Sequence, residues 1–190
     1  MKLRAELYID TLRERVKLSY FFVYSFIMLF YGHVLLGILA FLLLKLFGVF
    51  SIFGDSGFMA FLLMGIFVFI GALLPDIDEA NSKVNKWSGP IGKIVAALFK
   101  HRGILHSVLL FFVLSLVVWK LVGQAYGIAL FAGYLAHILG DSITPMGVKI
   151  FIPFSEFKIK GPIRVGSIWE KFLWGVLVLV NAILFWKVLI

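Results

Sequence analysis

The chain has 190 residues with a mean hydropathy of +1.06, and 62% of its residues are hydrophobic. A soluble domain is about 45–50% apolar, so one buried core cannot take up this much apolar surface and lipid must form part of the solvent. There is no cysteine, which excludes disulfides and thiolate metal ligands, and the net charge of +8 is better explained by basic loops beside membrane spans than by nucleic-acid binding.

The first 17 residues predict an amphipathic helix in front of a single transmembrane helical domain over residues 18–190. The apolar residues of this helix, interspersed with charged ones, are Leu3, Leu7, Ile9, Leu12 and Val16. Such a helix lies on the inner membrane surface, where anionic lipids attract Lys and Arg, or it is solvated and makes no membrane contact. The pattern leaves both open. The segment has no small-residue cleavage site, so we do not expect a signal peptide.

Five apolar stretches predict an all-α fold, a polytopic membrane helical bundle of about five transmembrane helices. They cover residues 18–50, 58–74, 104–122, 125–139 and 168–190, and each approaches the ~20 residues that a helix needs to cross the hydrocarbon layer. The fourth is short, so four spans plus a re-entrant segment is an alternative. The first has 33 residues, too many for a core of about 30 Å, and a bend or break is expected at Gly32.

The basic residues predict how the spans are oriented. If five spans alternate, fifteen of the eighteen Lys and Arg residues fall on one side, in the N-terminal segment and in the loops after the second and fourth spans. Only Lys45, Lys120 and Lys187 fall on the other side. Because basic loops stay in the cytoplasm, we expect a multi-pass protein of the cell membrane with a cytoplasmic N-terminus and an external C-terminus.

Two carboxylates follow the second span, in GALLPDIDE. Pro75 stops the helix, and Asp76 and Asp78 then point to one side of an extended segment. Two such carboxylates repel each other unless a cation lies between them, so we expect at least one of them to bind a metal. The alternative is that both are loop acids, one of them a helix cap.

The third span opens with KHRGILHS. His101 and His106 do not align on a regular helix, but a turn at Gly103 would let both reach one centre. Arg102 suits a phosphate or carboxylate, because its planar fork forms bidentate hydrogen bonds. The alternative is an arginine that snorkels to the membrane edge.

The fourth span ends in GYLAHILGDSITPMG, which places His137 and Asp141 four residues apart on one helical face. This spacing presents two ligands to one cation, and the alternative is a hydrogen bond within the helix. With three other histidines in the chain, His33 is expected to be a further ligand. Imidazole and carboxylate suit Zn²⁺, with Mn²⁺ or Fe²⁺ as alternatives. There are more candidate ligands than the four that one tetrahedral zinc binds, so we expect one or two metal ions. If two ions bind, an aspartate is expected to bridge them.

The run LLPDID, then HRGILHS, then GYLAHILGDSITPMGVKIFIP, in this order and spacing, closely resembles the YdjM-like family of membrane-bound metal-dependent hydrolases over residues 32–190. That family looks distantly similar to zinc-dependent phospholipase C and the related single-strand-specific nucleases. By that similarity, the matching metal ligands are His33, Asp76 or Asp78, His101 or His106, His137 and Asp141, with Asp141 as the bridging candidate.

The resemblance implies a membrane-embedded hydrolase that cleaves a phosphoester, in a phospholipid or a lipid-linked phosphate, with membrane lipids as partners. A metal would activate the attacking water, and Asp78, or whichever of Asp76 and Asp78 is not a ligand, would accept its proton. Arg102 and the metals would bind the charge that develops on the phosphate oxygens. Because intramembrane His and Asp also mark ion pathways, a metal or proton transporter is one alternative. Another is a non-catalytic scaffold with a structural metal.

Overall fold

The computed structural model describes residue 13 and residues 30–52, 57–99 and 102–190. The α-helices in these residues are the Phe30–Leu46 helix, α2 (Val49–Ile52), α3 (Phe58–Leu73), α4 (Lys83–Trp87), α5 (Gly89–Leu98), α6 (Val108–Leu121), α7 (Gln124–Ser142) and α8 (Ile168–Leu189). Two short 3₁₀ helices, η1 (Leu74–Asp78) and η2 (Ile104–His106), follow α3 and precede α6. The amphipathic helix predicted over residues 1–17 lies outside this description, apart from residue 13.

The predicted all-helical class is confirmed for the described residues, in which β structure is limited to one antiparallel bridge between Val148 and Ile159. Each of the five apolar stretches contains a long helix. Among the described residues, two helices are long and apolar enough to cross a membrane, Phe58–Asp78 and Ile168–Leu189. The Phe30–Leu46 helix and α6 are apolar but shorter. Five membrane crossings therefore remain a prediction.

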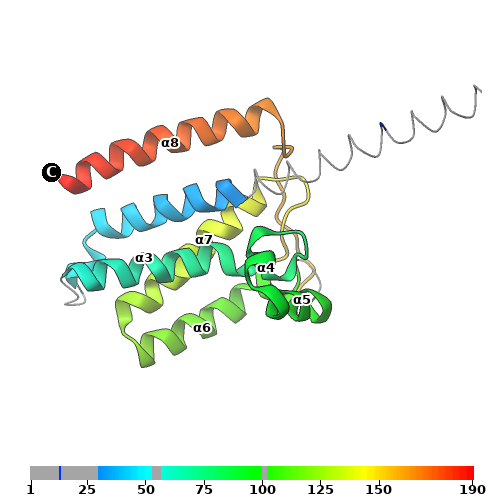
Figure 1. Ribbon diagram of the computed structural model, residues 1–190, viewed down its shortest axis with the longest axis horizontal. Coiled ribbons are helices and arrows are strands. Elements are labelled where there is room, and N and C mark those ends of the chain that lie inside the picture. The colour runs from blue at the N-terminus through cyan, green and yellow to red at the C-terminus, as the bar shows by residue number, and fades with distance from the viewer. Residues whose placement is uncertain (1–12, 14–29, 53–56, 100–101) are drawn as a thin grey trace, which may run out of the picture.

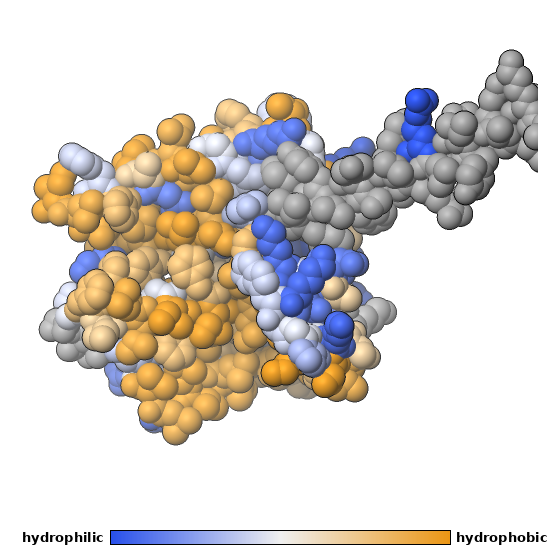
Figure 2. All heavy atoms as spheres, in the orientation of Figure 1, coloured by the Kyte–Doolittle hydropathy of each residue, from blue (hydrophilic) through white to orange (hydrophobic). Residues whose placement is uncertain are grey.

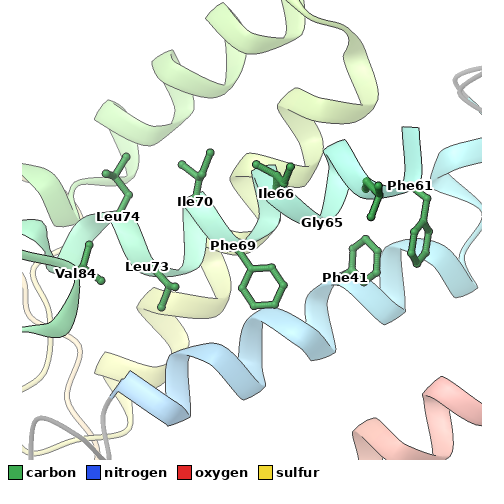
Figure 3. A pocket seen from close by; sticks show the side chains of 10 residues that line it. Phe41, Phe61, Gly65, Ile66, Phe69, Ile70, Leu73, Leu74 and Val84 are labelled. Atoms are coloured by element: carbon green, nitrogen blue, oxygen red, sulfur yellow. The ribbon is translucent and has the colours of Figure 1, made fainter. Parts of the chain in front are cut away.

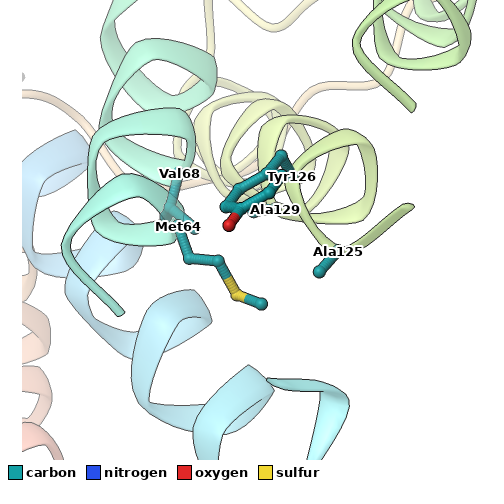
Figure 4. Close-up of a cluster of buried hydrophobic side chains, with 5 residues drawn as sticks. All are labelled: Met64, Val68, Ala125, Tyr126 and Ala129. Atoms are coloured by element: carbon teal, nitrogen blue, oxygen red, sulfur yellow. The ribbon is translucent and has the colours of Figure 1, made fainter. Parts of the chain in front are cut away.

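Helix α7 forms the centre of the bundle. Twelve of its 19 residues are buried, and it packs against α3 and α6. Figure 4 shows Met64 and Val68 of α3 meeting Ala125, Tyr126 and Ala129 of α7 in one apolar cluster. Because protein covers most of α7, the buried face of this helix can carry ionisable side chains that would be costly against lipid.

Two glycines bring α3 and α7 into backbone contact. A Cβ atom at Gly71 would collide with the backbone of Leu130 and Tyr134, and one at Gly133 would collide with the backbone of Val68. Without side chains at these two points the helices approach more closely than ordinary helix packing allows. This contact places the last turn of α3 against the second half of α7.

The Phe30–Leu46 helix includes Gly32, so the described residues show no break at this position. Gly32 instead makes room for α8: a Cβ atom there would lie 2.5 Å from Cζ2 of Trp174. Farther along the same pair of helices, the Asn181 side chain donates a hydrogen bond to the carbonyl oxygen of Leu35 at 3.0 Å. Helix α8 thus packs along the Phe30–Leu46 helix, as Figure 1 also shows.

The surface divides into apolar flanks and a hydrophilic end. Figure 2 shows apolar residues over the sides of the long helices and hydrophilic residues gathered near α4 and α5. Large apolar side chains such as Phe58, Phe112 and Leu179 are at least half exposed. Exposed apolar area on this scale is typical of a surface that faces lipid.

Candidate metal centre

Four separate elements bring imidazoles and carboxylates together at the hydrophilic end of the bundle. The Phe30–Leu46 helix supplies His33, η1 supplies Asp76 and Asp78, η2 supplies His106, and α7 supplies His137 and Asp141. All of these except Asp76 are at most 3% exposed, and the Asp76 side chain is 15% exposed. The structure thus brings six of the seven candidate ligands together. The seventh, His101, lies outside the described residues.

The position of His137 follows from the way α3 ends. Pro75 has no backbone N–H and the chain tightens into η1, so the last carbonyl groups of α3 lack the helical donors that would follow. One of them, the carbonyl of Ala72, lies 2.8 Å from Nδ1 of His137. With the Nδ1 proton donated to this carbonyl, the lone pair of His137 is on Nε2, the arrangement typical of metal-binding histidines.

His106 is oriented in a similar way by a carboxylate. Its Nδ1 lies 3.3 Å from Oδ2 of Asp78, and its backbone carbonyl accepts a hydrogen bond from the hydroxyl of Tyr134 at 2.8 Å. The opposite nitrogen, Nε2, then faces Oδ2 of Asp141 at 3.4 Å. A carboxylate behind an imidazole fixes its tautomer and raises its basicity as a ligand.

The atoms that converge have the spacing of ligands around one ion. Ligands at about 2.0–2.1 Å from a tetrahedral zinc lie about 3.3 Å from one another. Nε2 of His106 and Nε2 of His137 are 3.2 Å apart, and they lie 3.4 and 3.7 Å from Oδ2 of Asp141. This oxygen is buried and forms no hydrogen bond with the described residues. A divalent cation among these three atoms would satisfy all of them, so the donor set fits a metal ion.

His33 extends the cluster on its other side. Its Nε2 lies 3.7 Å from Oδ1 of Asp141, and its ring stacks on that of His137 with centroids 4.0 Å apart. The Nδ1 edge of the His33 ring packs against Gly140, where a Cβ atom would lie 2.7 Å from Nδ1. Two overlapping groups result, His33–His137–Asp141 and Asp76–His106–His137, each with donor atoms within 4.8 Å of one another. The arrangement therefore has donors for one or two ions.

Arg102 contacts the cluster through Asp141. One guanidinium nitrogen lies 2.5 Å from Oδ1 of Asp141, and another donates to the carbonyl of Gly147 at 2.7 Å. Arg102 adopts φ = 57°, a left-handed conformation that is uncommon for non-glycine residues. The arginine therefore has protein partners and does not simply snorkel to the membrane edge.

Metal binding at this cluster depends on pH, because an imidazole nitrogen must carry no proton when it binds a metal ion.

The geometry also decides between alternatives that the sequence leaves open. Nε2 of His137 is 3.7 Å from Asp141, too far for a hydrogen bond within the helix. Asp78 is buried against an imidazole rather than being a solvated loop acid, and α4 is capped by Ser82, which accepts from the backbone N–H of Asn85.

Sequence reasoning missed the Ala72 carbonyl and the Tyr134 hydroxyl. Only the spacing of Tyr134, three residues before His137, places it near the site.

Comparison with known proteins gives the same residues a family context. The family model for the YdjM inner membrane protein matches residues 28–190. Inner membrane protein YdjM of Escherichia coli K12 is 36% identical over 110 residues, which is 53% of this chain and 56% of that protein. The protein YvsG of Bacillus subtilis is 27% identical over 120 residues, 62% of this chain and 74% of that protein. The chain spans little more than half the length of the E. coli relative. No solved structure matches significantly.

Proposed function

This chain belongs to the YdjM inner membrane protein family, and we propose that it is a membrane-embedded metal-dependent hydrolase that cleaves a phosphoester of a lipid. One observation carries the proposal. The Nε2 atoms of His106 and His137 converge on the buried Oδ2 of Asp141, and the far side of each imidazole is held by Asp78 or by the carbonyl of Ala72. Ligands oriented in advance in this way are typical of metal sites.

The proposal gives each side chain a role. His106, His137 and Asp141 hold the metal, and His33 and Asp76 complete its ligands or bind a second ion. A divalent ion held there, such as Zn²⁺, supplies a water of lowered pKa and a positive charge for the phosphate oxygens. Asp76 is the most exposed of the ligands, so water and substrate reach the centre from its side.

Two roles differ from those predicted from the sequence. Asp78 is buried behind His106, so in this proposal it orients that ligand instead of accepting a proton from water. Arg102 is bound to Asp141 and to the carbonyl of Gly147, so it positions the carboxylate and adds positive charge instead of clamping the phosphate with its whole fork. Both remain necessary for hydrolysis, but through the ligands that they hold.

The position of the centre relative to the apolar helices and the basic residues supports a lipid substrate. The donor cluster lies at the end of the apolar segment Phe58–Asp78, and most basic residues fall on that side if the predicted spans alternate. We place this side at the cytoplasmic face, where lipid phosphates lie at the depth of the centre. The cations that gather there favour an anionic reacting group.

The first test is metal content. The full chain is purified in detergent without a metal-chelating tag, and bound zinc, manganese and iron are measured for wild type, His137→Ala and Ser115→Ala. Ser115 is a matched control, because it is also buried in the bundle but packs near Gly127, about 15 Å along α7 from His137. We expect wild type and Ser115→Ala to retain one or two ions per chain and His137→Ala to lose them. Equal metal content in all three would refute the centre.

The second test is hydrolysis. The metal-loaded protein is incubated with a panel of phospholipids and lipid-linked phosphates, and released phosphate or headgroup is measured. Cleavage by wild type and Ser115→Ala, but not by His137→Ala, is the expected result. A stoichiometric metal with no cleavage of any ester would count against the hydrolase and favour a structural metal.

A further inference from the structure

An apolar groove of about 600 Å³ runs along α3 toward the metal centre. Its far end is lined by Phe61 and Leu62, and its near end by Leu73, Leu74 and Val84. In Figure 3, Phe61 and Phe69 of α3 and Phe41 of the Phe30–Leu46 helix project into the space between these two helices. The lining is almost wholly hydrocarbon, so the groove fits an apolar, elongated occupant.

We propose that this groove binds one acyl chain of an anionic phospholipid whose headgroup lies beside Lys83, with its phosphoester next to the metal centre. The inference rests on the proposed function, because it names the substrate class of that hydrolase and the surface that positions it.

The length of the groove matches one leaflet. From Phe61 to Leu74 the lining follows 13 residues of helix, about 20 Å at 1.5 Å per residue. One leaflet, measured from the headgroup level, contributes about half of the ~40–45 Å that a bilayer spans with its headgroup regions. A single acyl chain therefore extends along the groove from the headgroup level nearly to the middle of the bilayer.

The near end of the groove adjoins the metal ligands. Leu74 is the first residue of η1, and Asp76 follows two residues later in the same turn. Asp76 is also the most exposed ligand of the centre. A lipid whose chain lies against Leu74 has its headgroup region at the side from which the centre is accessible.

Lys83 supplies the matching charge at this end. It follows Ser82, the cap of α4, and is the neighbour of the groove residue Val84. Its ammonium donates to the hydroxyl of Tyr31 at 3.4 Å and lies 4.6 Å from the ring centroid of Phe30. An ammonium has three N–H donors, so the Lys83 side chain can hold its place against the aromatic rings and still donate to a phosphate.

Helices α4 and α5 fix the depth of this end. Trp87, Ile91, Ile94 and Leu98 form an exposed apolar stripe, with exposed fractions from 58% to 73%. Lys86 and Lys93 lie among them and are also exposed. An apolar stripe bordered by lysines is typical of a helix lying in the membrane interface, and Trp prefers headgroup depth. The near end of the groove is therefore at the level of lipid phosphates.

The test fills the groove without touching the metal ligands. A Cβ atom at Gly65 would lie 3.6 Å from the Phe41 ring, an ordinary contact, and one at Gly175 of α8 would meet nothing within 4 Å. Gly65→Leu therefore fills the groove, and Gly175→Leu is its matched control. The full-length variants are purified in detergent with equal amounts of dioleoyl phosphatidylglycerol and dioleoyl phosphatidylcholine, and retained lipid is counted by native mass spectrometry.

In EDTA, which stops the proposed hydrolysis, we expect wild type and Gly175→Leu to retain one phosphatidylglycerol, and Gly65→Leu to retain about tenfold less. Lys83→Ala should still bind lipid but lose about fivefold of its preference for phosphatidylglycerol. Circular dichroism checks that each variant is folded. Equal retention by wild type and Gly65→Leu would overturn the proposal. So would a wild-type dimer that Gly65→Leu dissociates, because the groove would then be an interface between two copies.

The same spectra separate this inference from the proposed hydrolase, because lipid is counted in His137→Ala and in protein treated with EDTA. Specific retention of phosphatidylglycerol without hydrolysis by any metal-loaded sample would uphold the groove and refute the hydrolase. Hydrolysis of phospholipid at wild-type rate by Gly65→Leu would uphold the hydrolase and refute the groove.

Discussion

Replacing Asp78 by asparagine keeps the size of the side chain and removes the charge behind His106. In wild type, Oδ2 of Asp78 is 3.3 Å from Nδ1 of His106, and this contact directs Nε2 toward Asp141. The amide is a weaker acceptor and can also present its NH₂ group to Nδ1, which would favour the tautomer with the proton on Nε2. Loss of such an outer partner weakens metal binding about 10–100-fold, which corresponds to about 1.4–2.8 kcal/mol.

Zinc affinity is measured by competition with a chromophoric chelator, using full-length protein in detergent at neutral pH. The matched control is Glu79→Gln, because Glu79 is the next acid on the same turn and is only partly buried. This variant loses the same charge, and its zinc affinity should stay within about twofold of wild type, as expected for a charge screened by solvent.

Two outcomes would refute the reasoning. If Asp78→Asn bound zinc within about twofold of wild type, the Asp78–His106 contact would not orient the ligand. If its affinity fell as far as that of His137→Ala, Asp78 would itself be a metal ligand, which the sequence alone allows.

Two further predictions test the surroundings of the centre. Gly140→Ala places a methyl group 2.7 Å from the His33 ring and should destabilise the protein by about 1–3 kcal/mol and weaken zinc binding, whereas Gly175→Ala should do neither, as thermal unfolding and chelator competition would show. Tyr134→Phe removes the hydrogen bond to the His106 carbonyl and should cost about 1–2 kcal/mol in denaturant unfolding; an unchanged midpoint would contradict this.

The sequence predicted the parts of the centre that local periodicity controls. The spacing of His137 and Asp141 along one helix, and the helix-ending Pro75 before two carboxylates, can be read from neighbouring residues alone. Local periodicity also predicted a helix in each apolar stretch. It did not predict α4 and α5, although Trp87 and Leu98 bound a stripe with helical spacing, because lysines between two apolar stretches are also typical of a loop between spans.

The division of roles within the centre depends on tertiary contacts that spacing does not encode. Which of Asp76 and Asp78 faces His106 is decided by the 3₁₀ turn of η1, whereas the sequence suggested an extended segment. The carbonyl that orients His137 is available only because Gly71 and Gly133 let α3 and α7 touch. The partners of Arg102 lie about 40 residues away in the sequence, so local sequence patterns do not predict them either.

The burial of α7 has a consequence for how the protein is made. A helix that keeps its polar side chains for contacts with other helices offers the insertion machinery less apolar surface than α3 or α8 do. Only Val122 and Gly123 separate it from α6, so the two helices form a hairpin, which would enter the bilayer as one unit if both are spans as predicted. The donors on η1 are synthesised before this hairpin and those on α7 with it. The donor atoms of the candidate metal centre therefore come together only when the hairpin has docked on α3, so any metal would bind late in assembly.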